Sequence, residues 1–183
     1  MQNIKFYLRE MIDIDHRNFL ELSDEEAGVN CNSDKKFGEI FLDACQRNAV
    51  IFSIIDKCTN NYIGYVMVKH ADTSTPELGI SIQPEYQFQG IGTAALKIAS
   101  QTYAQTHPID YFLIRVKAYN KASQRMVEKL GAQRLDDEGD VMLDIVKKFT
   151  QEIGGEQGNS LLTKFLDGYD VESQNVFRYR YDV

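Results

Sequence analysis

The segment spanning residues 77–119 constrains the fold of this chain more than any other. It follows the order strand, glycine-bearing turn, amphipathic helix and strand, with "ELGISIQ" at 77–83, "QFQGIG" at 87–92, the helix at 92–107 and "YFLIRVKAY" at 111–119. A strand–helix–strand crossover within one sheet is right-handed, and its two strands are parallel. We therefore expect a parallel pair of strands, with the glycine turn at the start of the helix that joins them.

The rest of the chain predicts one mixed sheet with helices on both faces. Period-two alternation and flanking turn residues predict further strands at 4–10, 49–56, 62–70, 133–137 and 175–183. Helical spacing predicts helices at 11–22, 33–48 and 120–132, while the polar segment 23–34 reads as loop. Asn60 and Asn61 suit a tight hairpin turn. This order of elements predicts an α/β (α+β) domain whose sheet is mostly antiparallel.

A helical insertion is expected at 140–174, before the last strand. An amphipathic helix at 140–153, the break "GGEQGN" at 154–159 and a second short helix at 160–169 make up this segment. We expect residues 1–183 to form a single domain that carries it. In an alternative register, "DVMLDIV" at 140–146 is the partner strand and the remainder is a C-terminal tail.

Composition excludes several classes of protein. The 183-residue chain has 43% hydrophobic residues, a net charge of −7, and no run of eighteen apolar residues or secretory signal core, so neither a membrane nor bulk nucleic acid is expected as a partner. Its three cysteines form no CxxC pair, which argues against a disulfide scaffold and a thiolate zinc site. We expect a cytoplasmic protein without a metal. The acidic surface is a weak indication of a cationic binding partner.

The glycine turn raises the question of a phosphate site. Backbone N–H groups and the positive end of a helix dipole bind phosphates readily. Two familiar phosphate loops are excluded, because no lysine follows Gly92 and because Ala95 stands where GxGxxG needs its third glycine. The turn alone therefore leaves both a simple turn and an anion site open.

Two motifs at a fixed separation identify a family. Gln87–Gly92 fits the pattern Gln/Arg-x-x-Gly-x-Gly/Ala, and the second motif consists of Asn120, Ser123 and the run Glu128–Gly131. With these motifs the chain resembles the GNAT superfamily of acetyl-CoA-dependent N-acetyltransferases, clearly over 62–138 and in its order of elements from residue 4. Their form is similar to the branch with ribosomal-protein and polyamine acetyltransferases. The resemblance implies a GNAT-like fold, in which the two parallel strands splay apart.

The resemblance also implies a site for acetyl-CoA. Backbone N–H groups of the loop would hold the pyrophosphate, the first strand of the crossover would pair with the pantetheine arm, and Asn120 would bind the cofactor besides capping its helix. The residues implied are Ile80, Ser81, Ile82, Gln87, Phe88, Gln89, Gly90, Ile91, Gly92, Thr93 and Asn120. Phe88 replaces the usual glycine of the family. We expect it at a negative φ, with its ring over the cofactor or in solvent.

Acetyl transfer to an amine needs a group that removes a proton, because an alkyl amine is mostly protonated at pH 7. Glu77 matches the position of the family's catalytic glutamate, although it is equally a polar residue at the end of a strand. A backbone N–H near Ile82 is the expected oxyanion donor. The tyrosine acid of many family members corresponds to Val127 here, so Ser123 or Tyr119 is the candidate acid, or none is needed.

The function implied is N-acetyl transfer from acetyl-CoA to a primary amine, by direct attack in a ternary complex. The alternative is a non-catalytic CoA-binding or sensor module on the same fold, which Val127 favours. The acceptor stays open between a small primary amine, a polyamine, an amino sugar and a peptide N-terminus. The insertion is expected either to wall the acceptor site, to form a homodimer contact, or to pack at the domain edge.

Overall fold

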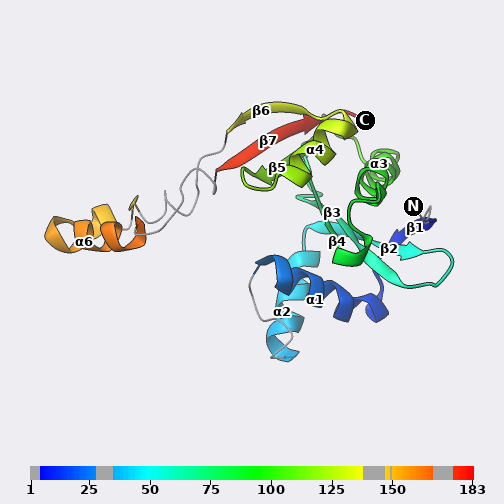
Figure 1. Cartoon of the computed structure of the whole chain (residues 1–183), viewed down its shortest axis with the longest axis horizontal. Helices are drawn as coiled ribbons and strands as arrows, with labels where there is room; N and C mark the ends of the chain where they lie inside the picture. The colour runs from blue at the N-terminus through cyan, green and yellow to red at the C-terminus, as the bar shows by residue number, and fades with distance from the viewer. Residues whose placement is uncertain (1–4, 28–34, 138–146, 149, 167–174) are drawn as a thin grey trace.

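One sheet dominates the computed structural model, which describes residues 5–27, 35–137, 147–148, 150–166 and 175–183 (Figure 1). Its seven strands follow the order β1-β2-β3-β4-β5-β7-β6. The strands are β1 (Phe6–Glu10), β2 (Ala49–Asp56), β3 (Tyr62–Lys69), β4 (Glu77–Ile82), β5 (Phe112–Lys117), β6 (Gln133–Asp137) and β7 (Val176–Tyr181). The helices are η1 (Asp13–Asp15), α1 (His16–Ala27), α2 (Lys35–Gln46), η2 (Pro84–Tyr86), α3 (Ile91–Ala104), α4 (Lys121–Leu130) and α6 (Gly155–Leu166).

The parallel pair expected from the crossover is β4 and β5. The other neighbouring strands pair antiparallel. Within the described residues, pairing joins Glu77 to Leu113 and Leu78 to Ile114, and it ends there. Beyond Leu78, β4 continues beside β3 while β5 continues beside β7. The two strands therefore diverge, which confirms the splayed pair.

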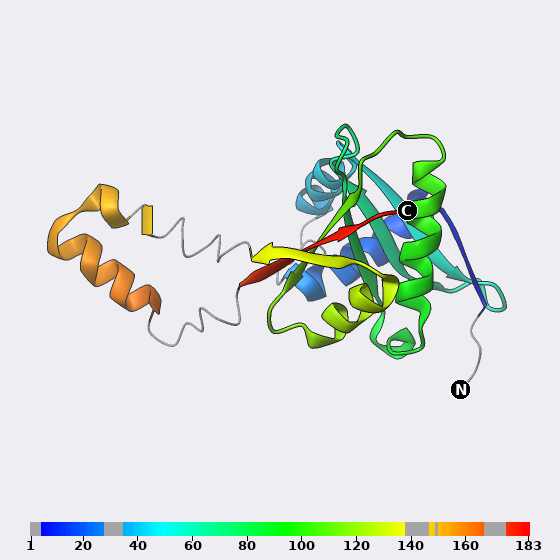
Figure 2. The ribbon, with the colours of Figure 1, turned by 90° about the horizontal axis from the view of Figure 1, so that it is seen from above.

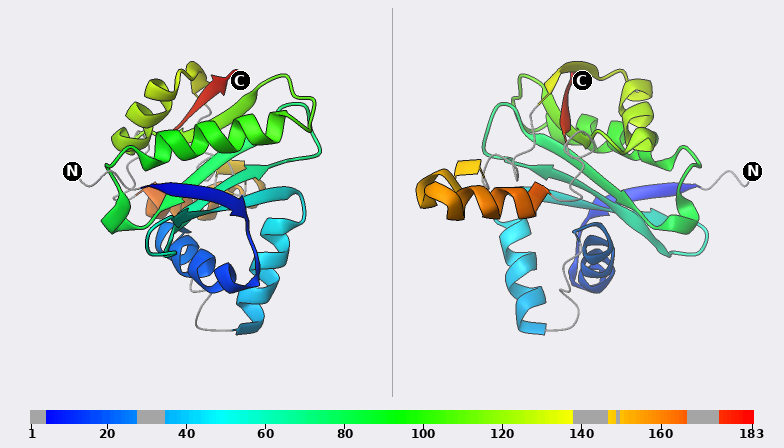
Figure 3. Two further views of the ribbon diagram at one scale, coloured as in Figure 1. Left: turned by 90° about the vertical axis from the view of Figure 1, so that its right-hand side faces the viewer. Right: turned by 60° about the vertical axis from the view of Figure 1, so that its left-hand side comes forward.

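Helices cover both faces of the sheet, as predicted. α3 and α4 pack on one face, and α1 and α2 on the other (Figure 3). β5 shows how its sequence separates the two faces. Its residues Phe112, Ile114 and Val116 are buried in the core beneath α3 and α4, whereas Arg115 and Lys117 alternate onto the opposite face. The apolar core of the domain therefore lies mainly on the α3 and α4 side.

Helix α1 extends further than predicted. It runs to Ala27, so the expectation of a loop beginning at residue 23 is wrong, while 28–34 fall outside the described residues. Glu25, Glu26 and Ala27 are strong helix formers, and their helix propensity outweighs the polar, turn-like composition of the segment. The helix expected at 33–48 is α2. Within the described ranges, none of the helices combines the length and apolar character that a membrane crossing requires.

The described part of the insertion is a pair of helices. Residues 147–148 and 150–153 are helical, Gly154 breaks the helix with a φ of 67°, and α6 begins at Gly155. The predicted break at 154–159 is therefore wrong after Gly154. A Cβ at Gly158 would lie 2.2 Å from the carbonyl oxygen of Thr150, so this glycine permits a close helix crossing instead of a flexible linker.

This helix pair stands apart from the sheet, beyond the ends of β6 and β7 (Figures 1 and 2). Its described residues line neither of the two cavities discussed below. A role in walling the acceptor site stays a prediction. A role in dimerisation stays a prediction. The alternative strand at 140–146 falls outside the described residues, and β7 pairs on that side with β6, as the leading register predicted.

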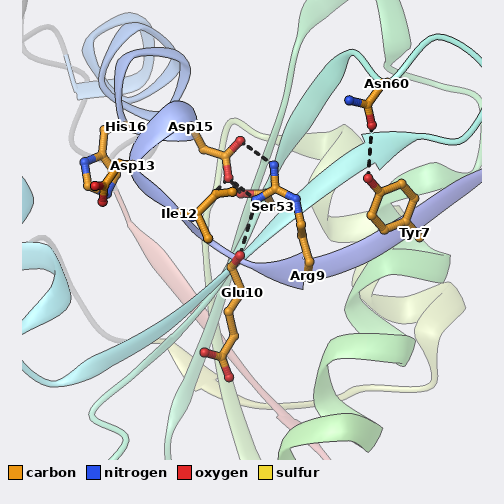
Figure 4. Close-up of polar contacts among 9 residues, drawn as sticks. All are labelled: Tyr7, Arg9, Glu10, Ile12, Asp13, Asp15, His16, Ser53 and Asn60. Atoms are coloured by element: carbon orange, nitrogen blue, oxygen red, sulfur yellow. Dashed lines mark hydrogen bonds and ion pairs between the residues drawn. The ribbon is translucent and has the colours of Figure 1, made fainter.

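A buried carboxylate fixes the junction between β1 and α1 (Figure 4). Asp15 in η1 is 2% exposed, and its Oδ1 accepts a hydrogen bond from Arg9 Nη2 at 2.9 Å. Its Oδ2 accepts from Ser53 Oγ at 2.8 Å and from the Ile12 N–H at 3.2 Å. These bonds join β1, β2 and the start of α1, and they satisfy a charge that would otherwise be costly to bury.

Candidate active site

The two glycines of the loop serve different purposes. Gly90 caps the start of α3 with a φ of 82°, a left-handed conformation that glycine adopts at little cost, and a Cβ there would meet nothing within 4 Å. Gly92 has no such conformation. A Cβ at Gly92 would lie 2.6 Å from the Sδ of Met126, so its absence lets α3 pack against α4. One glycine shapes the loop, and the other brings two helices together.

Phe88 adopts a backbone conformation that side chains disfavour. Its φ is 58°, so the expectation of a negative φ is wrong. The loop keeps the left-handed turn that suits the family's usual glycine, and Phe88 accepts the strain of that turn. Its side chain is 84% exposed, at the rim of the cavity that the loop forms.

This strain leads to a prediction from a matched pair of variants. Phe88→Gly and Phe88→Ala both remove the ring, but alanine retains the cost of a positive φ. We expect the glycine variant to exceed the alanine variant in free energy of unfolding by about 1 kcal/mol. Urea denaturation of both variants measures this difference. Equal stability would show that the loop relaxes to a negative φ at residue 88.

A cavity of about 400 Å³ lies between the end of β4, the glycine loop and α4. It brings together nine of the eleven residues expected at the cofactor: Ile80, Ser81, Ile82, Gln87, Phe88, Gly90, Gly92, Thr93 and Asn120. Gln89 and Ile91 are not among its lining. Ile91 is buried in the core, and Gln89 Nε2 donates to the carbonyl oxygen of Glu85 at 2.9 Å.

Gln87 joins the glycine loop to the end of β4 by hydrogen bonds. Its N–H donates to the Pro84 carbonyl oxygen at 3.2 Å, and its Nε2 donates to the Ile82 carbonyl oxygen at 2.8 Å. The donors expected for an anion must therefore come from later in the loop and from the first turn of α3, where N–H groups lack partners within the helix. The edge of β4 beyond Leu78 is available for an extended arm that pairs as an added strand.

Sequence reasoning missed several residues on α4. Ala122, Arg125, Met126 and Lys129 all line this cavity, as does Tyr86 from η2. The α4 residues recur at intervals of three and four, so they share one face of the helix. Counting from the predicted cap would have identified that face. Arg125 and Lys129 add positive charge where the chain could hold phosphate groups.

A second cavity, of about 470 Å³, lies where β4 and β5 diverge. Its walls include apolar residues of the α3 and α4 face, among them Leu78 and Val127, as well as polar residues of the opposite face. Four residues line both cavities: Ile80, Asn120, Ser123 and Met126. The two cavities therefore meet at the gap in the sheet. The candidate catalytic residues Glu77, Tyr119 and Ser123 all line the second one.

Glu77 is enclosed by cations. Its side chain is nearly buried, with 7% of the residue exposed. Oε1 accepts from Lys69 Nζ at 3.1 Å, and Oε2 accepts from Arg115 Nη1. Each carboxylate oxygen thus accepts from one cation and keeps a second lone-pair direction that can accept a proton. Glu77 begins β4, as a polar strand-end residue does, and it also lines the second cavity.

The candidate acids, Ser123 and Tyr119, lie at the N-terminal end of α4. Asn120 Oδ1 accepts from the Ser123 N–H at 3.0 Å, which confirms Asn120 as the helix cap. Ser123 is half-buried, while Tyr119 is 56% exposed with Lys117 Nζ 5.6 Å from its ring centroid. Val127 is buried in the wall of the second cavity. In the described part of the chain, no group of three or more His, Cys, Asp or Glu side chains could hold a metal ion.

The sequence model of the family described as "Acetyltransferase (GNAT) domain" matches residues 5–133. The chain belongs to the GNAT acetyltransferase family. This match takes in the whole crossover, both motifs and the start of β6, and it confirms the resemblance that the motifs indicated. A comparison with curated proteins gave no match.

Solved structures share the GNAT fold. A single-residue mutant of spermidine N-acetyltransferase SpeG from Vibrio cholerae is 15% identical and has a TM-score of 0.67, with 96% of this chain and 94% of that chain covered. The spermidine/spermine N-acetyltransferase SpeG from Vibrio cholerae, in complex with manganese ions, is 16% identical with a TM-score of 0.66 and coverage of 98% and 94%. At such identity, the likeness shows the fold alone.

Proposed function

We propose that this protein transfers an acetyl group from acetyl-CoA to a primary amine, by direct attack within a ternary complex. The observation that carries the proposal is the junction of the two cavities where β4 and β5 diverge. A cofactor in the glycine-loop cavity and an amine in the second cavity can be held at the same time. The spermidine substrate named for two structural neighbours supports an amine acceptor.

The residues of the first cavity fit acetyl-CoA. The open space at Gly90 leaves room for an anion beside the start of α3, and the helix dipole favours negative charge there. Arg125 and Lys129 suit the remaining phosphate charge. The edge of β4 from Gly79 to Ile82 suits the amides of the pantetheine arm. When bound, acetyl-CoA supplies an activated thioester.

The residues of the second cavity would carry out the proton transfers. Glu77 takes a proton from the amine, directly or through water, as the new N–C bond forms. A backbone N–H near Ile82 stabilises the oxyanion, and the C–S bond then breaks. Ser123 or Tyr119 donates a proton to the departing thiolate, or the thiolate leaves unprotonated. The acetylated amine and CoA are the products.

A non-catalytic CoA-binding module is the second candidate. It is favoured by Val127, an apolar residue where many family members have a tyrosine acid, and by the two ion pairs that occupy Glu77. Thioester consumption distinguishes the two functions, because a sensor binds the cofactor without releasing thiol.

Titration calorimetry with acetyl-CoA, followed by thiol release across a panel of amines, tests the proposal. We expect binding and amine-dependent release. Arg125→Gln removes a charge from the cofactor cavity and is expected to weaken acetyl-CoA affinity about tenfold. Lys97→Gln, on the exposed surface of α3, is the matched control and should leave affinity unchanged. Binding without release on any amine would support the sensor, and no binding would refute both functions.

A further inference from the structure

The second cavity has two sides of different chemical character. Its polar side contains Glu77 and the cations that donate hydrogen bonds to it. Its apolar side consists of residues of the core beneath α3 and α4, among them Leu78, Leu96 and Val127. Glu77 and Leu78 are neighbours in β4, and alternation along the strand places them on opposite faces of the sheet. A ligand in this cavity therefore meets charged groups on one side and hydrocarbon on the other.

Two apolar side chains lie where this cavity meets the glycine-loop cavity. Ile80 and Met126 line both cavities, each is half-buried, and both pack against the core beneath α3 and α4. Their ends converge on Gly92, because a Cβ there would lie 2.6 Å from Met126 Sδ and 3.8 Å from Ile80 Cδ1. Methionine is unbranched and flexible, so Met126 can adjust to what lies beside it. Ile80 and Met126 therefore join the glycine-loop cavity to the apolar side of the second cavity.

The two sides suit different parts of the reaction. In the proposed function, the thioester and the amine meet at this junction. An amine would lose its hydration against the apolar side without gaining a hydrogen bond there, so it belongs on the polar side, where Glu77 lies. The chain of the acyl group has the opposite preference. Each methylene that is fully buried against apolar side chains tightens binding about fourfold.

We propose that the protein also takes acyl-CoA donors whose acyl group is longer than acetyl, with an unbranched hydrocarbon chain such as propionyl or butyryl lying against Met126 and Val127. This inference rests on the proposed function and names the donor class for the same site. An acetyl group fills only a small part of a cavity of about 470 Å³, and a longer chain buries more of its apolar side. A chain that ends in a carboxylate would place a charge against hydrocarbon and is disfavoured there.

Calorimetry of the full chain with a series of CoA thioesters, in the absence of any amine, tests the inference. The series consists of acetyl-CoA, propionyl-CoA, butyryl-CoA and succinyl-CoA, whose chain has the length of butyryl but ends in a carboxylate. We expect affinity to rise about threefold for each added methylene, so that butyryl-CoA binds about tenfold more tightly than acetyl-CoA. Succinyl-CoA should bind no more tightly than acetyl-CoA. Butyryl-CoA binding no more tightly than acetyl-CoA, or succinyl-CoA binding as tightly as butyryl-CoA, would overturn the inference.

A matched pair of variants locates the chain. Val127→Thr keeps a side chain of similar size but adds a hydroxyl group to the apolar side of the cavity. Val68→Thr makes the same change in the same core, at a buried residue of β3 that lines neither cavity. We expect Val127→Thr to remove most of the preference for butyryl-CoA over acetyl-CoA, and Val68→Thr to keep the wild-type preference. A ratio of two affinities measured on one preparation does not depend on the fraction of protein that is folded. A wild-type ratio in Val127→Thr would overturn the placement of the chain.

Thiol release in the presence of an amine is measured separately. Binding that tightens with chain length, without release on any amine, would refute the transferase and support the donor class. Release from acetyl-CoA, without any preference for a longer chain in binding, would refute the donor class alone.

Discussion

Replacing Glu77 with glutamine is expected to lower the turnover number by about 10²- to 10⁴-fold, the range in which a positioned general base contributes. Glutamine keeps the shape of the side chain but cannot take up a proton. The Michaelis constant for acetyl-CoA should change little, because Glu77 lines the second cavity and not the glycine-loop cavity. Steady-state thiol release measures both parameters.

The pH dependence separates a base from a residue that only positions Lys69 and Arg115. Without a base, the rate depends on the fraction of amine that is already neutral in solution. The rate of Glu77→Gln should therefore rise about tenfold per pH unit below the pKa of the amine, near 10 for an alkyl amine. A positioning residue would lower the rate equally at every pH. An unaltered rate at pH 7 would remove Glu77 from the mechanism.

Glu85→Gln is the matched control for this experiment. Glu85 is an exposed carboxylate in η2, next to the cofactor loop, and it lines neither cavity. The substitution removes the same charge from the protein without touching the acceptor, so turnover should stay at the wild-type value. A similar loss in both variants would indicate a general effect of charge on the domain.

Local sequence signals predicted much of the fold. The crossover fixed the parallel pair, and the hairpin turn at Asn60 and the cap at Asn120 are each read from a short stretch of chain. Gly131, which ends α4, is another local signal. The structure places Asn60 at a φ of 59° and Gly131 at a φ of 99°, the left-handed conformations that such positions need. These features depend on near neighbours in sequence, and therefore the sequence specifies them directly.

Phe88 and the charged side chains that line the second cavity could not be predicted in the same way. A phenylalanine at positive φ is uncommon, so residue preferences predict a negative φ at Phe88. The turn around Phe88 sets its conformation instead. The charges around Glu77 come from β3 and β5, at Lys69, Arg115 and Lys117. Alternation in the sequence shows that Arg115 and Lys117 share a face, but only the pairing of strands shows that Glu77 shares it.

Replacing Asp15 with asparagine is expected to lower the free energy of unfolding by about 2–4 kcal/mol, because it breaks a buried ion pair and leaves Arg9 without its partner. Urea denaturation at pH 7 measures the loss. Asp13→Asn is the control, since Asp13 lies two residues away in the same turn but is exposed. We expect that variant to stay within about 0.5 kcal/mol of the wild type.

The pH dependence of stability in acid gives an independent test of the role of Asp15. Burial alone would raise the pKa of Asp15, but hydrogen bonds from Arg9, Ser53 and the Ile12 N–H outweigh burial and hold this pKa below its ordinary value. The folded state therefore keeps Asp15 ionised at a pH where the unfolded chain binds a proton. Its contribution to stability is complete above the unfolded pKa, near 4, and is lost as pH falls through the lower, folded pKa. The difference in free energy of unfolding between the wild type and Asp15→Asn should therefore become smaller at low pH. If this difference stayed constant down to pH 2, the hydrogen-bond geometry of Asp15 and not its charge would be what joins β1 to α1.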